Sequence, residues 1–167
     1  MAQSLFLHET FTPRYRTAYD AVDLQTEKPF QFVDVSALVE ERVRRSGVLE
    51  GSVAVQSRHT TAAVVVAENE EGLLADLEDC LATWAPRERP WRHDDLRYRQ
   101  GPVPADEPRN GHAHAQALLL PASVTLVVTG GKLDRGRYQS IFLVELDGPR
   151  RRTVSIQVMG ATDGGGW

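Results

Sequence analysis

The stretch GSVAVQSRHTTAAVVVAENEEGLLADLEDCLATW at residues 51–84 decides the predicted fold class. Residues 51–57 and 62–67 are rich in the small and β-branched side chains that favour strands, and only four residues join them. Residues 70–84 then carry leucines at helical spacing, which is typical of an amphipathic helix. The sequence therefore predicts two strands followed by a helix in this stretch.

The ends and the apolar face of that helix can be predicted from single residues. Asn69 is a plausible N-cap, and Glu70, Glu71 and Asp76 lie toward the positive end of the helix dipole. Cys80 falls among the leucines, so we expect a buried thiol that packs as a small hydrophobic group rather than a nucleophile. Because it is the only cysteine, an intrachain disulfide and a thiolate metal cluster are both excluded.

The remaining segments extend the same mixture of strands and helices. Further strands are predicted at residues 5–11, 29–35, 124–129, 140–145 and 153–159, and further helices at residues 36–47 and 111–119. Residues 85–109 contain five prolines, and we expect them to form a long, ordered loop. Residues 1–167 are therefore predicted to form a single α+β domain with a largely antiparallel sheet and about three helices.

Charge and hydropathy exclude two classes of partner. The chain has 19 basic and 23 acidic side chains, so it lacks the basic excess that broad nucleic-acid binding needs. No segment approaches the apolar length of a membrane span, and residues 1–4 do not begin a signal peptide. We therefore expect a soluble, cytoplasmic protein that binds neither nucleic acid nor membrane.

Four of the five histidines lie in the middle of the chain, at His59, His93, His112 and His114. Imidazole is both a common metal ligand and the usual acid–base group near neutral pH, so these side chains are candidates for a polar site. Scattered surface or core histidines are the alternative. On a helix, His112 and His114 would point about 200° apart, so only one would face a given site.

Two other polar groups have both a structural and a functional interpretation. Asn69 and Glu68 are either a helix cap and a solvated turn residue, or they surround one pocket together with His59. Arginines cluster at residues 135–137 and 150–152, where they would either hold an anionic ligand or form ordinary solvated turns.

Four segments together resemble the YjbQ-like family, the so-called secondary thiamine-phosphate synthases. Residues 59–69, HTTAAVVVAEN, resemble its HTTA-x-x-x-V-x-EN segment, and residues 91–95, WRHDD, resemble a second segment. Residues 109–119, RNGHAHAQALL, are similar to its N-x-H-A-H segment, and residues 139–150, QSIFLVELDGPR, to its closing segment. Two departures are visible. Ala67 replaces a frequent Asn, and residues 136–139 read GRYQ instead of GTWQ.

The resemblance implies an α+β fold, a homotrimer with pockets near subunit boundaries, and a divalent metal (zinc or magnesium) in some members. It also implies a weak thiamine-phosphate-synthase-like activity, in which a pyrimidine diphosphate and a thiazole phosphate are joined and pyrophosphate is released. On this basis the expected function is a metal-assisted transferase on a phosphorylated small-molecule substrate. The open alternatives are a metal-dependent hydrolase and a non-catalytic trimeric protein that binds a small molecule or metal.

The resemblance also suggests roles for individual residues, with His114 favoured over His112 as the inward-facing histidine. The expected catalytic residues are His59, Glu68, Asn69 and Glu145; the expected substrate-binding residues are Arg137, Gln139 and Arg150; the expected metal ligands are His59, His93 and His114.

Overall fold

The computed structural model describes residues 14–104 and 106–162. Within them the α+β class and the three predicted α-helices are confirmed. The elements are β1 (Tyr15–Gln25), β2 (Gln31–Asp34), α1 (Ser36–Ser46), β3 (Glu50–Ser57), β4 (Ala62–Glu68), α2 (Glu71–Trp84), the short 3₁₀ helices η1 (Arg92–Asp94) and η2 (Leu96–Tyr98), α3 (Gly111–Leu119), β5 (Ser123–Thr129), β6 (Lys132–Asp134), β7 (Gln139–Glu145) and β8 (Arg151–Ala161).

The strands form two sheets, and every pair of neighbours is antiparallel. The larger sheet has the order β1-β8-β3-β5-β6, and the smaller has the order β2-β7-β4. Strands β1 and β6 were not predicted, and the predicted strand at residues 5–11 lies outside the described residues. The inward face of β1 is only half buried and carries Asp20, which pairs with Arg42 of α1. A charge at an inward position hides the alternation that would otherwise indicate a strand.

Two hydrophobic clusters hold these layers together. The larger cluster packs Val35, Val39 and Val43 around α1 against valines and isoleucines of β3, β7 and β8. The smaller one packs Ala113 of α3 against Phe142 and neighbouring side chains of β4 and β7. Helix α1 therefore covers the larger core, whereas α3 covers the small sheet.

The second helix differs from its prediction at its N-terminus and along its apolar face. The cap is Glu70, whose carboxylate accepts hydrogen bonds from the backbone N–H groups of Gly72 and Leu73 at 2.8 and 2.7 Å. Asn69 instead donates to Asp34 at 3.0 Å, so the predicted Asn69 cap is wrong. The predicted burial of Cys80 is also wrong, because α2 buries only Leu81 fully and leaves Cys80 exposed.

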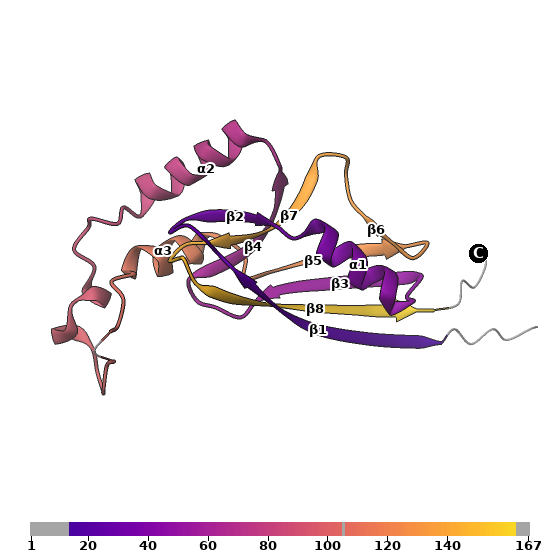
Figure 1. The fold of residues 1–167 in the computed structure, drawn as a ribbon, viewed down its shortest axis with the longest axis horizontal. Coiled ribbons are helices and arrows are strands. Elements are labelled where there is room, and N and C mark those ends of the chain that lie inside the picture. The colour runs from indigo at the N-terminus through magenta and orange to yellow at the C-terminus, as the bar shows by residue number, and fades with distance from the viewer. Residues whose placement is uncertain (1–13, 105, 163–167) are drawn as a thin grey trace, which may run out of the picture.

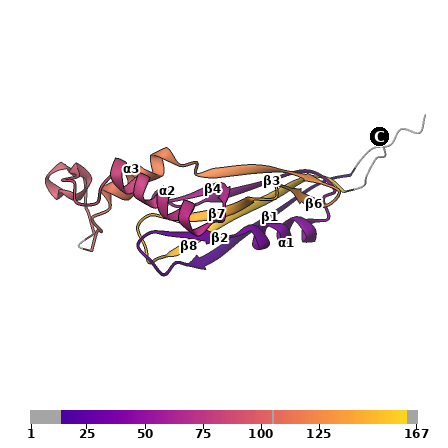
Figure 2. The same ribbon diagram turned by 90° about the horizontal axis from the view of Figure 1, so that it is seen from above.

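Figures 1 and 2 show why most side chains of α2 are exposed to solvent. It stands at one end of the elongated molecule beside α3 and the loop that joins them, away from the large sheet. Described residues of the joining loop are held by specific contacts, such as the bond from Trp91 Nε1 to the carbonyl of Pro86 at 3.0 Å. Among the described residues, no helix is both long and apolar enough to cross a membrane.

Candidate functional site

His59 lies in the connection between β3 and β4, and its ring is fixed by the backbone of β8. The N–H of Thr153 donates to His59 Nε2 at 2.7 Å, so Nε2 is the unprotonated nitrogen and a neutral ring carries its proton on Nδ1. Burial and the nearby Arg152 guanidinium lower the pKa of His59 below its usual value. The imidazole is therefore neutral near pH 7 and has one defined tautomer.

His114 of α3 and His59 line the same cavity, whose volume is about 380 Å³. We call this space the histidine cavity; its lining residues are Ser57, Arg58, His59, Thr60, Ala62, His114, Ala117, Leu118 and Ala122. Burial and the neighbouring His93 lower the pKa of His114 as well. Two neutral imidazoles from separate elements thus meet at one cavity, with Arg58 beside them.

His93 approaches this pair but is engaged by an arginine. Its ring packs edge-on against His114 with ring centroids 4.6 Å apart. Arg99 Nη1 lies 2.9 Å from His93 Nδ1, and the same guanidinium is paired with Glu107 at 2.7 Å. The ring nitrogens of His93 are thus turned to Arg99, and His93 does not line the histidine cavity.

The three expected metal ligands therefore do not form a metal site within one chain. The described residues contain no group of three or more His, Cys, Asp or Glu side chains placed to hold a metal ion. His59 and His114 supply two nitrogens, and His93 is turned to Arg99. The divalent metal stays a prediction.

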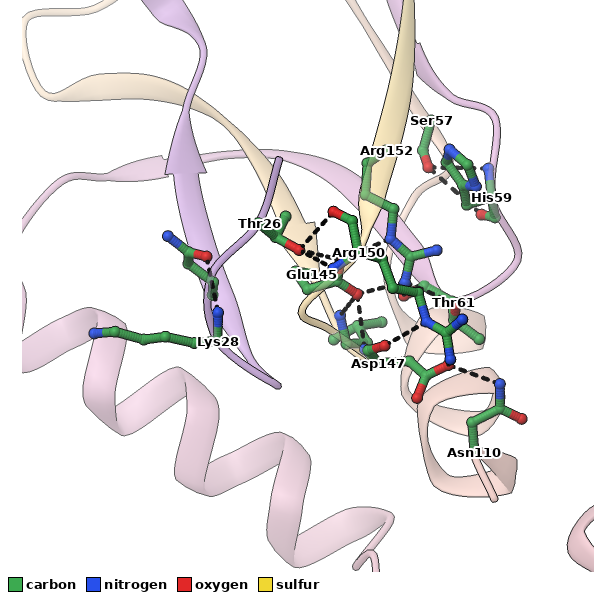
Figure 3. A network of polar contacts seen from close by, with 12 residues as sticks. Thr26, Lys28, Ser57, His59, Thr61, Asn110, Glu145, Asp147, Arg150 and Arg152 are labelled. Carbon is green, nitrogen blue, oxygen red and sulfur yellow. Dashed lines mark hydrogen bonds and ion pairs between the residues drawn. The ribbon is translucent and has the colours of Figure 1, made fainter. Parts of the chain in front are cut away.

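A buried ion pair between Arg152 and Glu145 lies next to the His59–Thr61 segment (Figure 3). Arg152 Nε donates to Glu145 at 2.6 Å, and Arg152 Nη2 donates to the same carboxylate and to Thr61 Oγ1 at 3.0 Å. Both side chains are almost fully buried. Because Arg152 holds Thr61 while Thr153 holds His59, consecutive residues of β8 fix both ends of the His59–Thr61 segment.

Glu145 has no free capacity for proton transfer in this arrangement. Besides Arg152, it accepts bonds from Thr26 Oγ1 at 2.9 Å and from the backbone N–H groups of Leu146 and Asp147 at 2.9 and 2.8 Å. Burial raises the pKa of Glu145, but the bonds from Arg152 and from the N–H of Asp147 outweigh it, so the pKa is lowered. The carboxylate is thus a structural anchor, and the catalytic role predicted for it has no support in its contacts.

Arg150 and Asn110 meet at Asp147, at the edge of the same group (Figure 3). Arg150 pairs with Asp147 Oδ2 at 2.9 Å, and Asn110 Nδ2 donates to that oxygen at 2.8 Å. Arg150 keeps 40% of its side chain exposed, so it can still meet a ligand. Among the described residues, Asn110 Oδ1 and His112 Nδ1 are the buried side-chain atoms without a hydrogen-bond partner.

The other predicted site residues lie at the far end of the small sheet. Glu68 is paired across β4 and β7 with Gln139, whereas Ala62 at the opposite end of β4 is paired with Glu145. Six residue steps along a strand correspond to about 20 Å. Gln139 accepts from the N–H of Gly136 at 2.8 Å, and Arg137 lies over its own neighbour Tyr138.

Within one chain, the structure therefore does not place Glu68 and Asn69 around one pocket with His59. The reason is geometric, since the extended strand β4 separates the HTTA end of its segment from the EN end. The roles predicted for Glu68, Asn69, Arg137 and Gln139 stay predictions.

Of the buried ion pair, sequence reasoning named Glu145 as a catalytic residue and missed its partner Arg152. It was treated only as one of three turn arginines. The sequence signal for the burial of Arg152 was the alternation of β8. Arg152 lies on the same inward face of this strand as Val154, Ile156 and Val158. An arginine on an inward face requires a buried anionic partner, and Glu145 at the end of β7 provides it.

Known proteins similar to this chain were found at the levels of family, sequence and structure. The YjbQ family model, described as UPF0047 protein YjbQ-like, matches residues 20–161. A UPF0047 protein of Methanothermobacter thermautotrophicus is 34% identical over 137 residues, which are 82% of this chain and 88% of that protein. The crystal structure of a YbjQ-like protein of unknown function from Sulfolobus solfataricus P2 is 35% identical, with a TM-score of 0.78 over 88% of this chain and 99% of that chain. A hypothetical protein from Aeropyrum pernix K1 is 34% identical, with a TM-score of 0.76 over 86% of this chain and 98% of that one.

These comparisons overturn the expected thiamine-phosphate-synthase-like activity. The matching family is described only as UPF0047, and the Sulfolobus relative is described as a protein of unknown function. The similarity therefore establishes the fold and the family of this chain, and it does not assign a reaction.

Proposed function

We propose, for a chain that belongs to the YjbQ-like family of UPF0047 proteins, that the histidine cavity binds a small anionic molecule such as a phosphorylated metabolite. The observation that carries the proposal is the convergence of His59 and His114 on one cavity. The cavity volume of about 380 Å³ suits a small ligand.

The hydrogen-bonding groups of the cavity favour an acceptor-rich ligand. The tautomer of His59 is set by Thr153, which leaves Nδ1–H as a donor. Arg58 lines the same cavity, and a guanidinium matches phosphate and carboxylate oxygens. No carboxylate lines the cavity among the described residues, so an anionic ligand meets no like charge at its wall.

The neutral imidazoles also suit proton transfer on a bound ligand. His114, whose pKa is lowered, is a base near pH 7, whereas His59 offers only its Nδ1–H because the bond from Thr153 occupies its Nε2. Chemistry at this site therefore means removal of a proton from a ligand oxygen, or its return, by His114, with the Nδ1–H of His59 as a hydrogen-bond donor to the ligand.

Assembly as a homotrimer is the second part of the proposal, and exposed apolar side chains near the cavity support it. Leu118, which lines the cavity, is 83% exposed, and its neighbour Leu119 is 51% exposed. Adjacent large apolar side chains that are exposed to solvent favour a protein interface. In a trimer, a neighbouring copy could bring further ligands for a divalent metal to His59 and His114. A cytoplasmic location belongs to the same proposal.

Inorganic phosphate is the probe that tests ligand binding. In a titration followed by ring ¹⁵N signals of histidine, we expect saturable shifts for His59 and His114. Arg58→Ala should weaken binding by about tenfold or more, the effect of losing a charged hydrogen bond. Arg44→Ala is the matched control, because Arg44 is exposed on α1 and does not line the histidine cavity. Phosphate that moves neither ring, or an equal loss in both variants, would contradict the proposal.

Light scattering of the purified protein tests assembly, with a mass of three chains expected. Leu118→Asp should reduce that mass, because it places a charge in the proposed interface. A single-chain mass in the unmodified protein would refute the trimer. Elemental analysis of the same sample tests for zinc and magnesium.

A further inference from the structure

A second cavity lies on the other side of α3 from the histidine cavity. His112 lines it together with residues of α2, of the segment after α2, and of the β1–β2 turn. Helix α3 therefore presents His114 to one cavity and His112 to another. We call the second space the His112 cavity; its lining residues are Lys28, Pro29, Phe30, Glu78, Ala82, Pro86, Arg87, Glu88, His112, Gln116 and Leu146.

The lining of the His112 cavity includes a buried imidazole with an unpaired nitrogen. His112 is only 5% exposed, and its Nδ1 has no hydrogen-bond partner among the described residues. Leaving a buried polar atom unpaired costs about 1–3 kcal/mol, so native structures rarely do so without a reason. In the orientation described, this nitrogen has almost no accessible surface, so a ligand in the cavity would remove the cost only if the imidazole turns about its Cβ–Cγ bond.

The chemistry of the floor and walls defines the ligand class. A neutral imidazole offers one donor and one acceptor. Gln116 donates its amide to the carbonyls of Leu81 and Ala85 at 3.3 and 3.2 Å, which leaves its oxygen as an acceptor. Phe30 and Leu146 add apolar walls to these polar groups.

The charges around the cavity do not favour an ion. Its exposed charged side chains are two cations, Lys28 and Arg87, and two anions, Glu78 and Glu88. Balanced charges in water give little net attraction for either sign. The cavity volume of about 440 Å³ is that of a small-molecule site.

We propose that the His112 cavity binds a small, uncharged, planar nitrogen heterocycle that carries both a hydrogen-bond donor and an acceptor. The ring lies against Phe30 and Leu146, and its polar edge pairs with His112 and Gln116. This site is independent of the anion site proposed for His59 and His114.

Benzimidazole is the probe, because it is planar and has one donor and one acceptor nitrogen. In a titration near pH 7.5, we expect saturable shifts of the His112 ring signals. Indole, which has the donor without the acceptor, should bind more weakly by about tenfold, the effect of one missing hydrogen bond in a buried site. His114→Asn should leave benzimidazole binding unchanged, whereas His112→Asn should abolish it.

A second variant keeps the test valid if His112→Asn does not fold. Ala82 lies on exposed α2 and lines the cavity, so Ala82→Trp fills the cavity without touching its floor. Ala75→Trp is the matched control, since Ala75 is exposed on the same helix and does not line the cavity. We expect Ala82→Trp to abolish benzimidazole binding and Ala75→Trp to leave it intact. Unshifted His112 signals, or equal binding by the two tryptophan variants, would overturn the proposal.

Discussion

Replacing Arg152 with methionine removes one partner of the buried ion pair and leaves the other in place. Glu145 would keep its bonds from Thr26 and from two backbone N–H groups, but it would lose both bonds from the guanidinium. Thr61 would lose the bond to Oγ1 that fixes the end of the His59 connection. The variant therefore tests whether this pair anchors the site.

The expected size of the effect follows from burial. The side chains of Arg152 and Glu145 are 4% and 0% exposed, so solvent cannot replace the lost bonds. Breaking a buried pair on one side costs about 3–5 kcal/mol, a large part of the stability of an ordinary domain. Arg151→Met is the matched control, because the neighbouring Arg151 pairs with Asp23 in solvent and such pairs contribute about 0–1 kcal/mol.

Urea unfolding at two pH values gives a specific signature. In the unmodified protein the pKa of Glu145 is lowered, so its contribution to stability is present above the unfolded pKa and is lost in acid. Without Arg152, burial dominates and the pKa of Glu145 rises. The loss of stability should then be larger at pH 7.5 than at pH 5, because the stranded carboxylate can protonate at the lower pH.

A double variant separates the ion pair from ordinary packing. Arg152→Met combined with Glu145→Gln removes the stranded charge, so it should be more stable at pH 7.5 than Arg152→Met alone. The pKa of His59 should also rise in Arg152→Met, since Arg152 lowers it in the unmodified protein, and it should rise less in the double variant, which also removes the opposing effect of Glu145. The reasoning is refuted if Arg152→Met loses no more stability than Arg151→Met, or if its loss is the same at both pH values.

Three further predictions concern the helices, the loop and the histidines. Glu70→Ala should destabilise the protein by about 1 kcal/mol in urea unfolding, because it removes the N-cap of α2; no loss would mean that the cap is elsewhere. Gly111→Ala would place a Cβ atom 2.5 Å from Cβ of Trp91, so hydrogen exchange should become faster in η1 and η2; unchanged exchange would contradict this packing. The free energy of unfolding should fall as the pH drops from 7 to 5.5, by up to about 1.4 kcal/mol per pH unit for each proton taken up, because the unfolded chain binds protons that the folded histidines resist. A flat profile would contradict the lowered pKa values of His59, His112 and His114.

Local sequence determined most elements of the fold. The small and β-branched side chains at residues 51–57 and 62–67 and the leucine spacing at residues 70–84 predicted β3, β4 and α2 at nearly their observed bounds. Gly47 was predicted to end α1, and it adopts the left-handed conformation there. These features depend on neighbours within a few residues, which is why the chain alone specifies them.

Contacts between distant residues decided what the sequence could not specify. The apolar stripe of α2 indicated a buried Cys80, but α2 packs along one edge only and leaves Cys80 exposed. A local sequence pattern does not indicate how much of an apolar stripe other elements of the fold will cover. The sequence indicated that His112 and His114 face opposite ways, and the structure adds that each lines a cavity of its own.

The histidine site shows the same division. The sequence by itself determined the family and the candidate residues, because these depend on residue types in a fixed order. Only the tertiary structure decided that His59 meets His114, that Glu145 is held by Arg152, and that Glu68 and Asn69 lie at the other end of β4. The physical reason is that antiparallel pairing brings together residues about 90 positions apart, as in the bond from Thr153 to His59, while an extended strand separates residues that are close in the chain.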